Sequence, residues 1–444
     1  MPPLISRVAL LAGGLAIVAA TLFNNRHILI RNIGMSGPHC RFCNSILATT
    51  FVDLGASPLA NSYLVPDALR QMEPFYPLHA YVCDACCLVQ VEAVEAPERI
   101  FKDYAYFSSF SKSWLAHARG FAVSARERFN LGADHLVVEV ASNDGYLLQY
   151  FQEAAIPVLG IEPADNIAAV AREKGIPTVA RFMGSALAGE LVAEGRQADL
   201  LVGINVFAHV PALHDFVAGL AKLLKREGTL CLEFPHLLRL MEQRQFDTIY
   251  HEHFSYFSLL TASRVLAHHG LRVFDVEQVP THGGSLRLFA CHQASNREAM
   301  PAVAALVAEE RSKGLDRTET YKSFSESVWR VKRNLLRFLI DARERNKTVV
   351  GYGAPAKGNT LLNFCGIRED LLPYTVDISP HKQNQFLPGT HIPIYPPARI
   401  AETKPDYVLI LPWNLRDEII AQMSHIRAWG GQFVVPLPDV EVIP

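Results

Sequence analysis

The sequence predicts an α/β protein built on a doubly wound sheet, with a small zinc-binding domain before the sheet and a Rossmann-like α/β domain after it. Three observations support this prediction. Strand-like apolar runs alternate with helical patterns between residues 136 and 234, as they do in doubly wound sheets. Two C-x-x-C pairs lie upstream of this region. Downstream, a glycine-rich turn at 348–359 joins a further strand-like run to a helical pattern.

The central sheet is expected to alternate strands with helices. Its predicted strands cover residues 136–140, 157–162 and 199–205, and the run 199–205 is expected to be the fourth strand of the sheet. A further buried strand is expected at 229–234. The predicted helices cover residues 146–155, 164–174, 185–194 and 212–226.

The turn after the first strand, residues 139–145, indicates a ligand. It reads Glu-Val-Ala-Ser-Asn-Asp-Gly and lacks the G-x-G-x-x-G series that binds a dinucleotide pyrophosphate. A carboxylate at Asp144 suits the sulfonium or amino acid end of S-adenosylmethionine (SAM), and Glu162, which ends the second strand, suits ribose hydroxyls. We therefore expect SAM rather than NAD, although acids at such turns can also cap helices. The predicted SAM-binding residues are Glu139, Ala141, Asn143, Asp144, Gly145, Glu162 and Asn205.

The two C-x-x-C pairs predict a structural zinc site with the thiolate ligands Cys40, Cys43, Cys83 and Cys86. The interval between the pairs is long for a compact zinc finger, and Cys87 is an alternative fourth ligand. Disulfide pairing is the competing explanation, and a cytoplasmic location disfavours it. The chain has 42 basic and 44 acidic residues and no basic block near these pairs, so we expect no nucleic-acid partner.

Residues 1–34 are expected to be an extension that the native protein lacks. Residues 8–23 are almost wholly apolar, but this run is short for a membrane span and resembles the core of a signal peptide. Secretion would oxidise the cysteine pairs and separate the protein from SAM. We therefore expect Met35 to be the natural first residue, with a cytoplasmic location and no membrane partner. N-terminal sequencing of the protein from its source tests this expectation.

Acid and base side chains are concentrated in the segment 246–257, after the strand-like run 229–234. In an extended segment, Tyr250 and Glu252 project to one side and His253 to the other. In a helical turn, Tyr250 and His253 share a face. Either arrangement can place a phenol, an imidazole and a carboxylate around a small substrate. The segment therefore predicts proton-transfer chemistry, although such segments can also fill a surface groove.

The last third of the chain predicts a second α/β unit. Helical patterns at 300–313 and 319–346 precede the glycine-rich turn, and strands near 373–377 and 406–412 follow it.

The glycine-rich turn of this unit is expected to bind an anion. A helix that starts after the turn offers amide donors, and Lys357 adds a positive charge. We expect the diphosphate of a nucleotide sugar. The alternatives are an NAD-binding domain, with Asp377 at the end of the next strand, and a purely structural sheet. The predicted substrate-binding residues are Gly353, Lys357, Asn359 and Arg287.

Over about residues 38 to 440, the chain resembles the sugar C-methyltransferases, because six motifs occur in the order seen in that family. These motifs are the two C-x-x-C pairs, YAYFSS at 104–109, the turn at 139–145, NVFAH at 205–209, YHEHF at 250–254 and THGGSLR at 281–287. The resemblance implies methyl transfer from SAM to a nucleotide-linked 4-keto-deoxysugar, typically at C3 through an enolate. It also implies a zinc-binding domain at 38–120, a SAM-binding domain at 121–290 and a nucleotide-sugar-binding domain at 291–444.

The resemblance further implies roles for single residues. His253 is expected to be the base, with Tyr250 and Glu252 as its neighbours. The chemistry of proton removal adds a separate expectation, that Glu252 fixes the imidazole tautomer. His209 is expected at the substrate, together with one tyrosine of the pair Tyr104 and Tyr106.

Other features leave alternatives open. We expect a monomer and structural roles for His236, His251 and His282. The turn 413–415 either contacts the nucleotide base or caps a helix through Asn414. Two rival functions are a nicotinamide oxidoreductase, which would use the turn at 351–358, and a zinc-ribbon scaffold protein with inactive enzyme domains.

Overall fold

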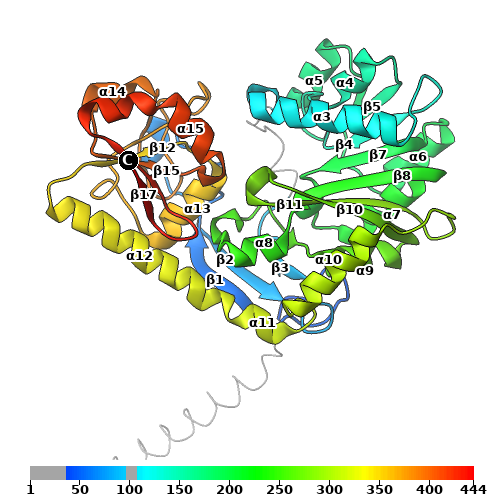
Figure 1. Ribbon diagram of the computed structural model, residues 1–444, viewed down its shortest axis with the longest axis horizontal. Helices are drawn as coiled ribbons and strands as arrows, with labels where there is room; N and C mark the ends of the chain where they lie inside the picture. The colour runs from blue at the N-terminus through cyan, green and yellow to red at the C-terminus, as the bar shows by residue number, and fades with distance from the viewer. Residues whose placement is uncertain (1–36, 97–107) are drawn as a thin grey trace, which may run out of the picture. The chain divides into compact units, whose positions relative to one another are not determined.

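Three β-sheets organise the chain in the computed structural model, which describes residues 37–96 and 108–444 (Figure 1). The predicted extension 1–34 and the tyrosines Tyr104 and Tyr106 lie outside the described residues. Residues 40–444 form one compact unit. Within the described ranges, no helix has both the length and the apolar character needed to cross a membrane.

The seven-stranded sheet has the strand order β10-β11-β8-β7-β4-β5-β6. Strands β8, β7, β4, β5 and β6 are parallel, and β11 lies antiparallel between β10 and β8. The doubly wound sheet that the apolar runs predicted is therefore present. The strands are β4 (Val137–Val140), β5 (Val158–Ile161), β6 (Thr178–Val179), β7 (Ala198–Ile204), β8 (Leu224–Pro235), β10 (Leu271–Val279) and β11 (Ser285–His292).

Strand β8 begins earlier than the sequence pattern predicted. A helix was expected over 212–226, but α7 ends at Leu223 and Leu224 already pairs with Ala198 of β7. The register then shifts across the charged residues 225–227, and regular pairing resumes at Thr229. Local helix propensity gives way here to pairing with a neighbouring strand, which depends on tertiary context.

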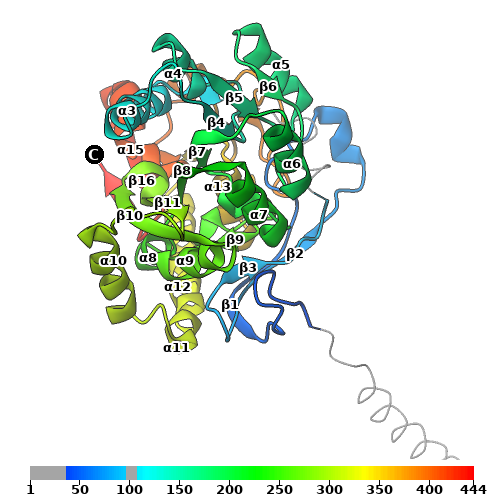
Figure 2. The ribbon, with the colours of Figure 1, turned by 90° about the vertical axis from the view of Figure 1, so that its right-hand side faces the viewer.

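Helices cover both faces of this sheet. Apolar residues of α3 and α4, including Phe121 and Phe151, form the core on one face. Residues of α6, α7 and α9, including Phe216 and Leu266, form the core on the other face, together with Cys83 of the zinc region. Figure 2 shows α3 and α4 on one side of β4 and β7, and α6 and α7 on the other. The helices are α3 (Lys112–Arg128), α4 (Leu148–Glu153), α5 (Asp165–Glu173), α6 (Ser185–Ala193), α7 (Leu213–Leu223), α8 (Leu237–Glu242) and α9 (Leu259–His268).

A four-stranded antiparallel sheet anchors the acid and base segment. Its order is β1-β2-β3-β9, and the edge strand β9 (Ser255–Tyr256) belongs to the segment 246–257. The other strands are β1 (Thr49–Ser57), β2 (Tyr76–Val82) and β3 (Val89–Val91). This sheet shares a hydrophobic core with the C-terminal region, where the ring of Phe51 stacks on that of Phe324 with centroids 4.4 Å apart.

The C-terminal region is the predicted second α/β unit. Its six-stranded sheet has the order β14-β13-β12-β15-β16-β17, and only β17 is antiparallel to its neighbour. The strands are β12 (Val349–Tyr352), β13 (Thr375–Val376), β14 (Ile394–Tyr395), β15 (Tyr407–Ile410), β16 (Gln432–Val435) and β17 (Glu441–Ile443). The helices are α10 (Pro301–Ser312), α11 (Thr318–Lys322), α12 (Phe324–Glu344), α13 (Ala356–Cys365), α14 (Ala398–Thr403) and α15 (Arg416–Gln422).

Candidate functional site

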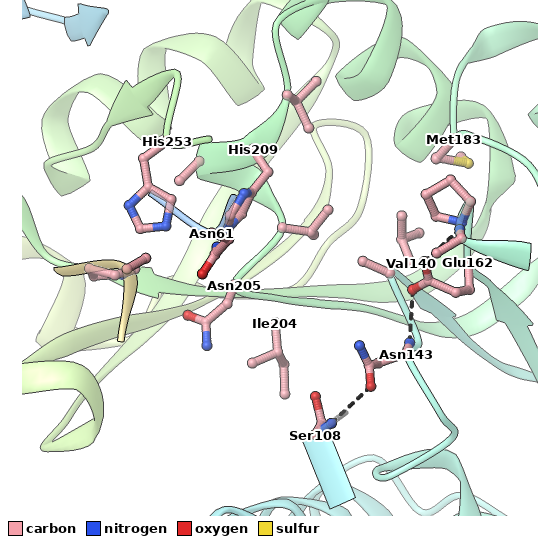
Figure 3. Close-up of a pocket in the computed structure, with 18 of the residues that line it drawn as sticks. Asn61, Ser108, Val140, Asn143, Glu162, Met183, Ile204, Asn205, His209 and His253 are labelled. Carbon is pink, nitrogen blue, oxygen red and sulfur yellow. Dashed lines mark hydrogen bonds between the residues drawn. The ribbon is translucent and has the colours of Figure 1, made fainter. Parts of the chain in front are cut away.

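A cavity of about 630 Å³ is lined by residues of the seven-stranded sheet and of segments that connect the strands of the other two sheets. Its volume is in the range of small-molecule and cofactor sites. Figure 3 shows Asn143, Glu162 and Met183 at one end and His209 and His253 at the other, with Ile204 and Asn205 between them. Asn61 of the N-terminal region and Lys357 of the C-terminal region complete the lining.

The turn after β4 lies at one end of this cavity. The carboxylate of Glu162 accepts hydrogen bonds from the backbone amides of Asn143, at 3.0 Å, and Ala164, at 2.9 Å. The Asn143 side chain in turn accepts from the amide of Ser108 at 2.9 Å (Figure 3). Ala141 and Asn143 adopt left-handed backbone conformations, with φ values of 55° and 48°. The turn is thus held by a side chain of one neighbouring segment and by a backbone amide of another.

Three of the predicted SAM-binding residues lie outside the cavity lining. The Asp144 carboxylate forms a salt bridge of 3.0 Å with Lys174, which follows the last residue of α5, and this pair joins the turn to the end of that helix. Glu139 is fully buried within β4, and burial raises the pKa of its carboxyl well above the usual value. Gly145 serves the backbone: its φ is 78°, and an added Cβ would lie 2.2 Å from Ile176. The structure therefore places these three residues behind the cavity wall and not in its lining.

The other predicted SAM-binding residues line the cavity, and their chemistry suits SAM. Glu162 and Asn143 supply polar groups, and Val140, Ile161 and Met183 supply apolar walls. A ribose needs the first kind of group and a purine ring the second. Ala141 and Asn205 also belong to the lining. The residues at this end therefore fit the cofactor that the sequence predicted.

The opposite end of the cavity contains a hydrogen-bonded histidine and tyrosine. The Nδ1 atom of His253 donates to the Thr248 carbonyl at 2.9 Å, because that oxygen can only accept. Nε2 of a neutral His253 is then an acceptor, and the Tyr250 hydroxyl donates to it at 2.8 Å. The backbone amide of His253 also donates to the Tyr250 carbonyl, so these residues share one face of a tight turn. The turn arrangement is the one of the two predicted alternatives that the structure contains.

Burial keeps the imidazoles at this end uncharged. Desolvation, followed by the neighbouring His209, lowers the pKa of His253 well below its usual value. Desolvation also lowers the pKa of His209 to about 4, and the rings of His209 and His253 meet edge to face with centroids 4.6 Å apart. Both rings line the cavity. An uncharged imidazole can accept a proton, so the end of the cavity that they form suits general base chemistry.

The sequence suggested that Glu252 fixes the imidazole tautomer of His253, but Glu252 does not perform this role in the structure. Its carboxylate accepts a hydrogen bond of 2.7 Å from the side chain of Asn61, and burial raises the pKa of Glu252 to about 7. The Thr248 carbonyl performs the predicted role instead. Because backbone carbonyls are not visible in a residue pattern, the sequence could not indicate this partner. Glu252 positions Asn61, which lines the cavity.

Two lysines of the C-terminal region face the cavity. Lys357 donates to the Asn414 side chain at 2.6 Å and lies over the Trp413 ring, 4.5 Å from its centroid. Burial lowers the pKa of Lys357 to about 8. Lys382, which the sequence analysis missed, donates to the Ala354 carbonyl at 2.8 Å and also lines the cavity. Asn414 therefore holds Lys357 rather than capping a helix.

Three predicted substrate-binding residues lie away from the cavity. Gly353 forms a turn with φ of 88°, where an added Cβ would meet Pro412 at 2.5 Å. The Asn359 side chain donates to the Ala60 carbonyl at 2.6 Å, which joins α13 to the N-terminal region. Arg287 is buried and bound to Glu233 at 2.7 Å. The Asn359 and Arg287 side chains bond to neighbouring segments, and Gly353 shapes the backbone of a turn, so the structure places these three residues outside the cavity lining.

The cavity is also lined by residues for which the sequence predicted no role in a site. His282 was expected to be structural, but it lines the cavity, and its Nε2 atom lies 3.0 Å from the Asn205 amide nitrogen. Its φ of 53° places it in the left-handed region. The ring of Trp114 in α3 lies beside it in a tilted arrangement, with ring centroids 5.2 Å apart. The THGGSLR motif was the available signal, although the member of it that was predicted to contact the substrate was Arg287.

His236 and His251 were expected to be structural. In the structure, His236 is bonded to Glu310 and His251 to the Pro77 carbonyl.

The cysteine pairs form a cluster with zinc-site geometry. The sulfur atoms of Cys40 and Cys86 are 3.6 Å apart, and those of Cys43 and Cys83 are 3.4 Å apart. A tetrahedral ion with Zn–S bonds of about 2.3 Å separates its sulfur ligands by about 3.8 Å. Cys86, and not the alternative Cys87, belongs to the cluster. All eight cysteines lie among the described residues and are free of disulfides. The four thiolates therefore fit the predicted structural zinc ion.

Comparisons with known proteins identify the family. Residues 40–101, 114–276 and 280–438 match families described as a zinc binding domain, a methyltransferase domain and a C-methyltransferase C-terminal domain. The chain is 38% identical to the C-methyltransferase NovU from Streptomyces niveus over 404 residues, which are 91% of this chain and 96% of the relative. The chain belongs to the C-methyltransferase family. This C-methyltransferase uses SAM as its methyl donor and contains a zinc-binding domain.

Two of the solved structures that resemble part of the chain are named as methyltransferases. One is magnesium protoporphyrin IX methyltransferase (ChlM) from Synechocystis PCC 6803 with bound SAM, with a TM-score of 0.33, 16% identity, and coverage of 46% of this chain and 100% of that chain. Another is a SAM-dependent methyltransferase from Clostridium acetobutylicum, with a TM-score of 0.31, 11% identity, and coverage of 39% and 90%. The seven-stranded sheet of the C-methyltransferase has the class I SAM-methyltransferase fold. The family assignment replaces both rival predictions, the oxidoreductase and the scaffold protein.

Proposed function

We propose that this C-methyltransferase methylates a nucleotide-linked 4-keto-deoxysugar at C3, with His253 as the base. One observation carries the proposal: a neutral imidazole, bonded to a phenol, faces the same cavity as the residues that fit SAM. The motifs shared with sugar C-methyltransferases support the sugar class. The two lysines at the cavity support an anionic carrier.

The chemistry requires removal of one proton from carbon. A ketone at C4 acidifies the C3–H bond, and the electron pair left when that bond breaks is held as an enolate. Nε2 of His253 accepts the proton, because Nδ1–H is committed to the Thr248 carbonyl. Bound SAM supplies an electrophilic methyl group, which the C3 carbon attacks as the bond from sulfur to that methyl breaks.

Tyr250 has two roles in this proposal. In the structure its hydroxyl donates to Nε2 of His253 at 2.8 Å. When a ketone enters the cavity, the hydroxyl turns to donate to the ketone oxygen, which frees Nε2 to accept the C3 proton. A donor already placed beside a developing enolate oxygen contributes most to catalysis when water is excluded. His209 and Asn205 line the same part of the cavity and complete the surroundings of the substrate.

The low basicity of His253 fits a buried reaction. A lowered pKa keeps the imidazole neutral throughout the physiological pH range, but it also weakens the base. The enolate that forms beside it is negatively charged. That charge raises the pKa of the imidazole at the moment of transfer, because an opposite charge nearby favours the protonated ring.

Lys357 and Lys382 are the proposed contacts for the diphosphate of the carrier. Both line the cavity, Lys357 from the first turn of α13 and Lys382 from the segment after β13, and Asn414 and the Ala354 carbonyl orient their amino groups. Lysine acts as a point charge for phosphate oxygens. In this proposal residues 38–120, 121–290 and 291–444 are the zinc, SAM and nucleotide-sugar domains of a monomer. A cytoplasmic location suits its free thiolates, which reducing conditions preserve.

Product analysis tests the proposed reaction. The enzyme is incubated with methyl-¹³C SAM and a set of nucleotide-linked 4-keto-deoxysugars, and each product is examined by two-dimensional NMR. We expect a ¹³C-methyl group bonded to C3 of the sugar. A methyl group on oxygen or nitrogen, or activity only on ketones that carry no nucleotide, would refute the proposal.

A further inference from the structure

Three histidines form a cluster outside the cavity, beside the cysteine cluster. His214 lies in the first turn of α7, and His268 and His269 lie at the end of α9. Each offers one ring nitrogen, and these three atoms lie within 4.8 Å of one another. None of these residues lines the cavity described above. The reaction proposed for the cavity gives them no role.

The tautomer of His214 is set by the zinc-binding region. Its Nε2 atom donates to the Phe42 carbonyl at 2.7 Å, since a carbonyl can only accept. The lone pair of neutral His214 therefore resides on Nδ1, which points toward Nε2 of His269 at 3.0 Å. A histidine that binds a metal usually donates its other ring N–H to a carbonyl or carboxylate in this way. His214 is thus oriented as a metal ligand by a residue that lies between Cys40 and Cys43.

One distance in the cluster, between His214 and His269, is close to that between two ligands of a tetrahedral ion. Two imidazole nitrogens bound at about 2.0–2.1 Å to such an ion are separated by about 3.4 Å. The separation of 3.0 Å between His214 Nδ1 and His269 Nε2 needs to open by only a few tenths of an ångström. His268 is exposed, so its side chain can turn toward the pair without disturbing the core. Its ring centroid is 4.9 Å from that of His214.

We propose that His214, His268 and His269 bind one divalent ion of the zinc class, in addition to the zinc ion of the cysteine cluster. Imidazole nitrogen suits Zn²⁺, Co²⁺, Ni²⁺ and Cu²⁺ and is a poor ligand for Mg²⁺ or Ca²⁺. A bound ion would join the start of α7 to the end of α9. Through the Phe42 carbonyl it would also hold both helices to the zinc-binding region. Its role is therefore to stabilise the packing of that region on the seven-stranded sheet.

Cobalt titration tests the proposal on the full-length protein. The protein is prepared with zinc in the cysteine cluster and dialysed against metal-free buffer, and Co²⁺ is then added while zinc content is followed by elemental analysis. We expect one further equivalent of metal, visible absorption from a nitrogen-ligated cobalt ion, and a melting temperature that rises with added Co²⁺. The zinc content should stay at one ion per chain.

Matched variants distinguish the histidine site from other binding. His268→Ala removes an exposed ligand without touching the core, and it should weaken the further equivalent at least about tenfold, since even partners of ligands change affinity by 10- to 100-fold. His214→Ala should do the same. His425→Ala, at an exposed histidine elsewhere in the chain, should leave the affinity unchanged. Absence of a further equivalent, or equal affinity in His268→Ala and the parent protein, would overturn the proposal.

Discussion

Replacement of Glu162 tests how the SAM end of the cavity is built. Its two carboxylate oxygens accept from the Asn143 amide at 3.0 Å and the Ala164 amide at 2.9 Å, so the side chain holds the turn after β4 to the start of α5. The same carboxylate lines the cavity where we expect the ribose of SAM. Glu162→Ala therefore removes a ligand contact and two supports of the turn.

The size of each effect follows from these bonds. A hydrogen bond to a charged group contributes about 1.5–3 kcal/mol, and a buried amide left without a partner costs about 1–3 kcal/mol. We expect the free energy of unfolding to fall by about 2–3 kcal/mol. This value is near the lower end of the cost for two unpaired amides, because water from the cavity can reach both of them. The affinity for SAM should fall by about 1–3 kcal/mol, which is about 5- to 150-fold.

Calorimetric titration with SAM and thermal melting measure the two effects separately. Glu162→Gln is the informative partner variant, because its side-chain amide keeps one acceptor oxygen. The free energy of unfolding should fall by about half as much in this variant as in Glu162→Ala. Glu173→Ala, at an exposed carboxylate at the end of the same helix, is the control and should change neither quantity. An unchanged affinity for SAM in Glu162→Ala, with the protein still folded, would refute the assignment of this end of the cavity.

Three further predictions concern the zinc ion, the substrate end and the base. Removal of zinc by a chelator, or the substitution Cys83→Ser, should lower the melting temperature. The affinity of the remaining folded protein for SAM should not change, because the cluster lies outside the cavity, and a fall in that affinity would contradict this prediction. The pKa of Lys357 is lowered to about 8, so its charge is lost as pH rises through that value. The KM of the parent enzyme for the nucleotide sugar should therefore increase at pH values above about 8. In Lys357→Arg, where the side chain stays charged, the KM should not change with pH. Equal pH profiles of the two enzymes would exclude Lys357 as the anion contact. Tyr250→Phe should lower kcat by about 10²-fold or more with unchanged affinity for SAM, and a smaller effect in single-turnover assays would remove Tyr250 from the proton transfer.

The sequence was most informative where structure depends on local pattern. Apolar runs that end in polar residues predicted the strands of the central sheet, and the ends of these strands meet at one edge because the strands are parallel. Asn143, Glu162 and Asn205 therefore line the cavity as expected. The cysteine spacing was equally direct, since a tetrahedral thiolate site needs little beyond its four ligands.

The sequence was least informative where one side chain had several available partners. Asp144 follows a strand in the same way as a ligand-binding acid, but it pairs with Lys174, the residue after α5. Arg287 belongs to a shared motif, yet it pairs with Glu233 on the neighbouring strand β8. The tautomer of His253 depends on the Thr248 carbonyl, which has no signature in residue types. Such choices are made by tertiary contacts, and a linear pattern does not contain them.

Hydrogen exchange at C3 without methyl transfer tests the central claim most directly. The enzyme is incubated with the nucleotide-linked 4-keto-deoxysugar in heavy water, with S-adenosylhomocysteine in place of SAM, and deuterium at C3 is measured by NMR against a reaction without enzyme. We expect exchange by the parent enzyme and by His425→Ala, because the enolate forms and returns. We expect no exchange in His253→Ala, the variant without the base. Exchange at the parent rate in His253→Ala would refute the role of His253 and place the base elsewhere in the cavity.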